Sequence, residues 1–181
     1  MSSNRMHNLA LTAVMTAVIC AVAPLSIPLG AVPFSLQTLI IPLIATVCAP
    51  SVALTATALY LLIGGLGLPV FAGYTGSFMH FLTPTGGYLI GMLLFPIVIG
   101  GLLHWRRSAT MVLTSNLVAG LLQLIAGSIW LSALAGMPLQ GALMTGAVAF
   151  IPALLVKSGI VFVCERALSR SGVLTLLSNK R

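Results

Sequence analysis

Residues 110–134 read TMVLTSNLVAGLLQLIAGSIWLSAL, a long apolar segment without a single charged side chain. A membrane-spanning α-helix needs about 20 predominantly apolar residues, so this segment is long enough to cross a bilayer. Five further apolar segments share the chain with it, at roughly 8–23, 35–49, 51–66, 85–103 and 142–164. The pattern predicts an all-α integral membrane bundle of six transmembrane helices. Residues 1–181 are expected to form a single transmembrane domain.

The overall composition indicates that lipid is the solvent of this chain. Apolar residues make up 59% of the 181 positions and charged residues only 5%, whereas a soluble domain carries roughly a quarter of its residues charged. The net charge of +7 is not arranged as a basic stripe with interleaved aromatic residues, so nucleic-acid binding is not expected.

The positions of the charged residues predict the orientation in the membrane. With six spans and a cytoplasmic N-terminus, residues 1–7, 49–51, 104–109 and the tail from Glu165 lie inside. Every Arg and every Lys except Lys157 then falls on the cytoplasmic side, as the positive-inside rule requires. Both termini are therefore predicted to be cytoplasmic.

The second and third spans are short and are separated by Pro50, a residue that breaks a helix. A tight reversal between two helices is the favoured interpretation. One long kinked span is the alternative.

Two connections on the predicted outer side, residues 24–34 and 67–84, are long, uncharged and rich in Gly, Pro and aromatic residues. Irregular backbone at membrane depth is tolerated only where it is buried in protein or lines a cavity. We expect these connections to form lids over an outward-facing pocket, with an interfacial aromatic belt as the alternative. The side chains expected to fold over the bundle are Val70, Phe71, Tyr74, Phe78, Met79 and Phe81.

The most informative polar residue is Lys157, within the last apolar segment VAFIPALLVKSGIVFVC (148–164). A lysine at mid-helix costs about 2.5–3.5 kcal/mol on insertion scales, and such residues face the bundle interior or a cavity. The predicted spans hold no carboxylate to pair with it. A polar or anionic ligand is the predicted partner, and snorkelling toward the cytoplasmic headgroups is the alternative.

Other polar residues in the spans are few. Gln37 lies near the outer end of the second span, where its amide could recognise a ligand. Gln123 and Asn116 are equally consistent with interhelical hydrogen bonds. In the first span, small residues recur at four-residue spacing, which lets another helix approach closely, either within the bundle or from a partner. This strip consists of Ala13, Ala17 and Ala21.

Catalytic and energy-coupling motifs are missing from the sequence. The chain has one acidic residue, no paired carboxylates, no metal-ligand cluster and no phosphate-binding GxxxxGK[ST] loop. It is therefore not expected to be an enzyme or to bind a cofactor. A ligand-binding bundle of this kind needs partners that supply energy.

Four runs now add a family resemblance: PFSLQTL (Pro33–Leu39), GLGLPVFAG (Gly65–Gly73), PTGGYLIG (Pro84–Gly91) and FIPALLVK (Phe150–Lys157). Together, in this order and at these spacings, they resemble the BioY family. The resemblance implies a biotin-binding S component of an energy-coupling factor (ECF) transporter in a bacterial cell membrane. It further implies docking, through the alanine strip, onto a transmembrane coupling subunit that carries two cytoplasmic ATP-binding subunits, which use the ATP.

The resemblance also implies a ligand site. Lys157 and Gln37 would hydrogen-bond to the ligand, and aromatic residues would form its walls and lid. The expected site consists of Lys157, Gln37, Phe34, Phe71, Gly73, Tyr74 and Tyr88. Family members carry Gly-Asp where this chain has Ala153 and Leu154, which removes an acceptor suited to the ureido N–H groups of biotin. An S component for another small vitamin and an assembly subunit that binds no ligand are the alternatives.

Overall fold

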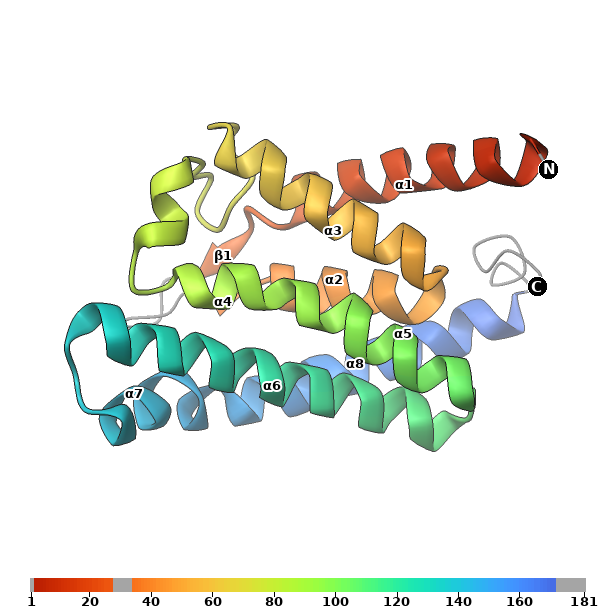
Figure 1. Cartoon of the computed structure of the whole chain (residues 1–181). Coiled ribbons are helices and arrows are strands. Elements are labelled where there is room, and N and C mark those ends of the chain that lie inside the picture. The colour runs from red at the N-terminus through yellow and green to blue at the C-terminus, as the bar shows by residue number, and fades with distance from the viewer. Residues whose placement is uncertain (1, 28–33, 172–181) are drawn as a thin grey trace.

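The computed structural model describes residues 2–27 and 34–171, and its helices run side by side along one axis (Figure 1). Six helical spans are present in this part of the chain, which confirms the predicted all-α architecture. The first three spans are α1 (Ser2–Val22), α2 (Gln37–Val47) and α3 (Pro50–Gly65). The fourth span is α4 (Gly86–Ile90), which continues through the 3-10 turn η2 (Gly91–Leu93) into α5 (Leu94–Trp105). The fifth span is α6 (Ala109–Ala135). The sixth span is α7 (Leu139–Gly146), which continues through η3 (Val148–Phe150) into α8 (Ile151–Arg170).

Four of these spans are long and apolar enough to cross a membrane: Asn4–Val22, Gly86–Trp105, Ala109–Ala135 and Leu139–Arg170. Helices α2 and α3 are shorter apolar helices of 11 and 16 residues. Pro50 is the first residue of α3, a position where its missing N–H is not needed. The prediction of two helices rather than one kinked span is thus confirmed.

The last span differs from its predicted range of 142–164. It begins at Leu139 and ends at Arg170, so Glu165 lies within the helix and not in a tail. Helix α6 ends at Ala135. Gly136 follows it with a φ of 63°, the left-handed conformation that often terminates helices, and a short turn leads to α7. Pro152 lies in the first turn of α8, just after the break between α7 and α8. The proline ring cannot continue a preceding helix, which explains this break.

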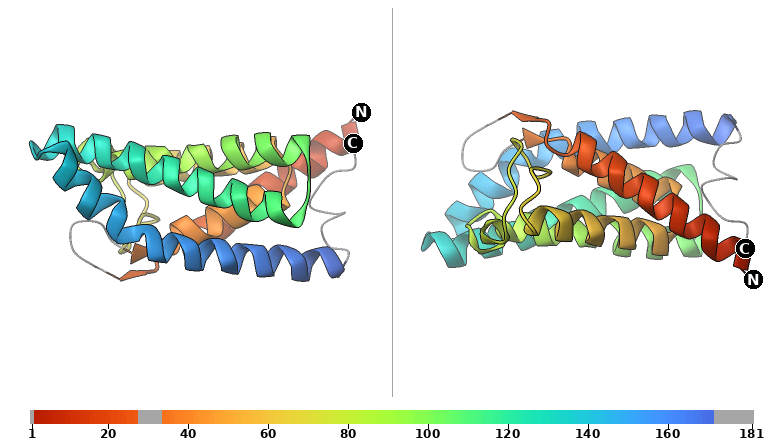
Figure 2. Two further views of the ribbon diagram at one scale, coloured as in Figure 1. Left: turned by 90° about the horizontal axis from the view of Figure 1, so that it is seen from below. Right: turned by 90° about the horizontal axis from the view of Figure 1, so that it is seen from above.

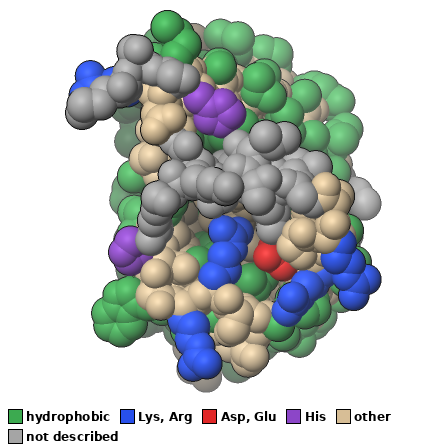
Figure 3. Space-filling model, turned by 90° about the vertical axis from the view of Figure 1, so that its right-hand side faces the viewer, with side chains coloured by type: hydrophobic (Ala, Val, Ile, Leu, Met, Phe, Trp, Pro, Cys, Tyr) green, Lys and Arg blue, Asp and Glu red, His purple; other side chains and the backbone are tan. Residues whose placement is uncertain are grey.

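The two ends of the bundle differ in chemistry. The start of α1, the α5–α6 junction and the end of α8 lie together at one end in all three ribbon views (Figures 1 and 2). Lys and Arg side chains gather on this end, around the acidic side chain (Figure 3). We call it the arginine end. The opposite end holds the antiparallel ribbon β1 (Ser26–Ile27) with β2 (Phe34–Ser35), the connection 66–85 with its 3-10 turn η1 (Phe78–Leu82), and the α6–α7 turn.

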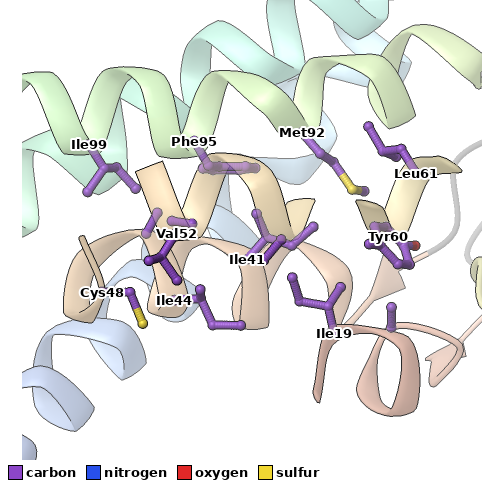
Figure 4. Close-up of a cluster of buried hydrophobic side chains, with 14 of the residues drawn as sticks. Ile19, Ile41, Ile44, Cys48, Val52, Tyr60, Leu61, Met92, Phe95 and Ile99 are labelled. Carbon is purple, nitrogen blue, oxygen red and sulfur yellow. The ribbon is translucent and has the colours of Figure 1, made fainter. Parts of the chain in front are cut away.

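The core lies where α2, α3 and α5 meet. Ile41, Ile44, Val52, Phe95 and Ile99 are buried against one another there (Figure 4). Asn116 of α6 adds a buried interhelical hydrogen bond, since its Nδ2 donates to the Thr46 hydroxyl of α2 at 3.0 Å. Of the two interpretations of Asn116, the structure thus favours the interhelical bond.

Helix α1 lies at the edge of the bundle and buries only one face. Thr12, Thr16 and Ile19 are buried against the bundle. The Thr16 hydroxyl donates a hydrogen bond to the Thr12 carbonyl one turn earlier, at 2.8 Å. The three alanines of the predicted strip, Ala13, Ala17 and Ala21, are exposed. The strip therefore does not serve packing within the described bundle.

Candidate ligand-binding site

A cavity of about 270 Å³ opens between α2, α4–α5, α6 and α8, beneath the connection 66–85. Its volume is close to the lower end of the roughly 300–1,000 Å³ typical of small-molecule sites. Its polar lining residues are Ser35, Gln37, Thr38, Thr75, His80, Thr85, Gln123 and Lys157. Its other lining residues are Phe71, Ala72, Tyr88, Leu89, Met92, Phe95, Gly120, Leu124, Phe150, Ala153 and Leu154.

Lys157 enters the cavity from α8. Its Nζ donates to the Ser35 carbonyl at 2.7 Å and to the Thr38 hydroxyl at 2.6 Å, and its side chain is only 7% exposed. Both acceptors lie beside the start of α2, at the end of the bundle away from the arginines. The snorkelling alternative is therefore wrong. The lysine finds acceptors within the protein, 122 and 119 residues away in sequence, whereas the sequence predicts a ligand as its partner.

Gln37 lines the same region of the cavity, and two hydrogen bonds fix the orientation of its side-chain amide. The Nε2 group donates to the Tyr60 hydroxyl of α3 at 2.6 Å, and Oε1 accepts from the Ser35 hydroxyl at 3.3 Å. Both Gln37 and Tyr60 are buried. Helices α2 and α3 thus fix the amide in the wall, next to the segment that binds Lys157.

Tyr88 forms the wall opposite, where α4 packs on α6. Its hydroxyl lies 3.0 Å from that of Ser128, and its carbonyl accepts from the Gln123 amide at 3.0 Å. A Cβ atom added at Gly127 would stand 2.2 Å from the Tyr88 ring, and one at Gly146 would stand 1.9 Å from its hydroxyl. Two glycines therefore make room for this ring. Gln123 fits both predicted roles, because it lines the cavity and also donates an interhelical hydrogen bond from α6 to α4.

The connection 66–85 covers the cavity through Phe71. Its ring is 2% exposed and packs edge-on against Tyr60, His80 and Phe81, with centroids 5.6, 5.9 and 5.8 Å away. A Cβ atom at Gly64 of α3 would lie 2.2 Å from this ring, so only glycine at this position leaves space for Phe71. The expected lid is present at this position.

Other residues expected in the lid point elsewhere. Gly73 and Tyr74 form the tip of the connection with φ of 73° and 59°, and neither lines the cavity. Tyr74 is 64% exposed, because the left-handed turn directs it away from the bundle. Phe78 and Met79 are likewise exposed, contrary to expectation. Phe34 begins β2, but its side chain and residues 28–33 lie outside what the structure describes.

Leu154 stands where the family resemblance implies an aspartate. Leu154 lines the cavity, and its Cδ1 would stand 2.2 Å from a Cβ atom at Gly120 of α6. Ala153 lines it too. Among the lining residues, Ser35, Thr38 and His80 were missed as site residues. Ser35 and Thr38 lie within PFSLQTL, where their spacing around Gln37 was a usable signal.

No group of three or more His, Cys, Asp or Glu side chains that could hold a metal ion occurs in residues 2–27 and 34–171. The cavity can instead hold a small, partly apolar molecule, oriented by one ammonium group and two amides.

The comparisons with known proteins agree with this geometry. Residues 1–172 match the model of the BioY family. The chain belongs to the BioY family. It is 35% identical to the biotin transporter BioY2 of Lactococcus lactis subsp. cremoris over 172 residues, which are 94% of each chain. It is 43% identical to the biotin transporter BioY of Thermotoga maritima over 116 residues, 64% of this chain and 68% of that one.

The fold is also that of a solved family member. The crystal structure of the S component for biotin from an ECF-type ABC transporter superposes with a TM-score of 0.85 at 29% identity, covering 94% of both chains. The resemblance of the four sequence runs to this family is thereby confirmed.

Proposed function

We propose that this multi-pass membrane protein is the biotin-binding S component of an ECF-type ABC transporter. The observation that carries the proposal is the cavity in which the buried Lys157 and the fixed amide of Gln37 meet, in a chain of the BioY family. The chain captures biotin for uptake and catalyses no reaction. It binds no cofactor itself, and ATP is used by two partner subunits.

Recognition combines a polar and an apolar part of the cavity. Lys157 and Gln37 provide hydrogen bonds at the base of α2, and charge-assisted bonds of the lysine are about twice as strong as neutral ones. The rings of Phe71, Tyr88 and Phe95 provide apolar walls for the ring system of the ligand. Biotin, with a ureido group on an apolar bicycle, matches this division.

The orientation follows from the charges at the two ends of the bundle. Arginines gather at the end where α1 begins and α8 ends (Figure 3), and basic residues stay on the cytoplasmic side. Both termini would then be cytoplasmic, and the cavity lies toward the outer face. The exposed strip of Ala13, Ala17 and Ala21 offers a smooth surface for the transmembrane coupling subunit.

The first experiment is equilibrium binding of labelled biotin to the purified protein in detergent. Wild type is expected to bind tightly, and Lys157→Met is expected to lose binding, because the cavity loses its ammonium group. Val156→Met is the matched control: the neighbouring side chain is 63% exposed on the lipid side, so this variant should bind as wild type does.

Thermal unfolding accompanies the titration, since Lys157→Met also removes a donor from the buried Ser35 carbonyl. A folded wild type that does not bind biotin would refute the biotin assignment, and binding of another vitamin would identify a related S component. Unchanged biotin binding by folded Lys157→Met would refute the role of the lysine. A wild type that binds no vitamin yet assembles with a coupling module would favour an assembly subunit.

A further inference from the structure

His80 is a cavity-lining residue to which neither the sequence motifs nor the proposed function assigns a role. It lies in the 3-10 turn η1, and its ring packs edge-on against Phe71 at 5.9 Å and 83°. Its carbonyl accepts from the Thr83 hydroxyl at 2.7 Å, which helps fix the turn. Within the described residues its imidazole makes no hydrogen bond to a protein group, so its nitrogens remain available to a ligand.

The charges of the cavity lining are all of one sign. Lys157 and His80 can carry positive charge, and none of the lining residues is acidic. The one acidic residue of the chain, Glu165, follows Lys157 by eight positions on α8, about 12 Å toward the arginine end. A ligand with one carboxylate therefore finds attraction and no repulsion from the described lining.

Lys157 and His80 have different surroundings. The Nζ of Lys157 is held by the Ser35 carbonyl and the Thr38 hydroxyl, near the Gln37 amide, a set of donors and acceptors suited to a ring with both N–H and C=O groups. His80 packs edge-on against the ring of Phe71, and the hydroxyl-bearing residues Thr75 and Thr85 of the same connection also line the cavity. A carboxylate is matched better at His80.

We propose that His80 binds the carboxylate of the ligand at the lid end of the cavity and so selects acids over their neutral derivatives. This inference rests on the proposed function. It gives the connection 66–85 a second role, since the segment that covers the ligand also recognises its charged end.

The test compares biotin with its neutral amide, biotinamide, in wild type, His80→Leu and the control His104→Leu, whose histidine is exposed at the arginine end of α5. Wild type should bind biotin roughly five- to tenfold more tightly than biotinamide, because a hydrogen bond to an ionised carboxylate is about twice as strong as a neutral one. His80→Leu should lose this preference, because leucine has no donor, and His104→Leu should keep it. Biotinamide should bind wild type and His80→Leu about equally.

Each other result is decisive. Equal losses of biotin and biotinamide in His80→Leu would mean a structural role and overturn the proposal. An unchanged preference for biotin over biotinamide in His80→Leu would overturn it as well, while leaving biotin capture intact. If folded wild type bound neither compound, the proposed function itself would fail.

Discussion

The substitution Gly127→Ala tests whether the wall of the cavity depends on the contact between α6 and Tyr88. The added methyl group would stand 2.2 Å from Cδ1 and 2.4 Å from Cε1 of the ring. The ring cannot retreat easily, because it is buried and its hydroxyl lies 3.0 Å from Ser128, with Gly146 beyond it. Overpacking of this kind costs about 1–3 kcal/mol. Loss of the hydroxyl hydrogen bond adds about 0.5–1.5 kcal/mol.

One term opposes this destabilisation. Alanine is favoured over glycine within a helix by about 0.5–1 kcal/mol, so the net loss of unfolding free energy should be about 1–3 kcal/mol. For a chain of this size the expected fall in Tm is roughly 2–12 °C. Because Tyr88 lines the cavity, displacement of its ring should also weaken biotin binding by about tenfold, which corresponds to about 1.4 kcal/mol.

Gly101→Ala is the matched control, since nothing lies within 4 Å of a Cβ atom at this position in α5. Thermal unfolding in detergent and a titration with labelled biotin are measured for both variants. Gly101→Ala should match or exceed the stability of wild type and bind biotin equally well. If Gly127→Ala is as stable as Gly101→Ala and binds as tightly, then the ring of Tyr88 does not form a fixed wall, and the close packing inferred for α4 on α6 is refuted.

Three further predictions concern the ligand, the docking strip and the orientation. Leu154→Asp should tighten biotin binding about tenfold in the same titration, because the new carboxylate can accept hydrogen bonds from the ureido group and bonds to charged groups contribute about 1.5–3 kcal/mol. Weaker binding would place the ligand's own carboxylate next to Lys157 and contradict the role of His80. Ala17→Leu should leave biotin binding intact but prevent co-purification with co-expressed coupling and ATP-binding subunits, while Ala133→Leu on the exposed face of α6 should co-purify normally; retention by Ala17→Leu would exclude the strip as the docking surface. In a variant without native cysteines, a cysteine at Tyr74 should react with an impermeant maleimide outside intact cells, and one at Trp105 only after lysis; the reverse result would invert the topology.

The helices could be predicted from the sequence because the bilayer imposes their length and composition. The segment 110–134 lies within α6, and Pro50 separates α2 from α3 as expected. The ends of the last span could not be predicted, since hydropathy falls at Glu165 although the helix continues to Arg170. A backbone in a helix satisfies its own hydrogen bonds, so it can extend beyond its apolar segment into the headgroup region.

The cavity was only partly predictable, because its geometry depends on contacts between distant segments. Lys157 and Gln37 stood out as polar residues in apolar runs, and both line the cavity. Tyr74 belonged to an equally apolar run, yet two successive residues with positive φ turn it outward. Such a backbone reversal is common for glycine but rare for tyrosine, so the outward direction of Tyr74 could not be predicted.

The partner of Lys157 illustrates the limit of inference from the membrane sequence. The cost of a lysine at mid-helix required a partner, and the absence of carboxylates pointed to a ligand. The structure supplies the Ser35 carbonyl instead, at the edge of a ribbon only two residues long. Open backbone of this kind is itself costly at membrane depth unless it is satisfied within the protein. The lysine and the ribbon therefore satisfy one another before any ligand arrives, which leaves the site already ordered and lowers the entropy that binding must overcome.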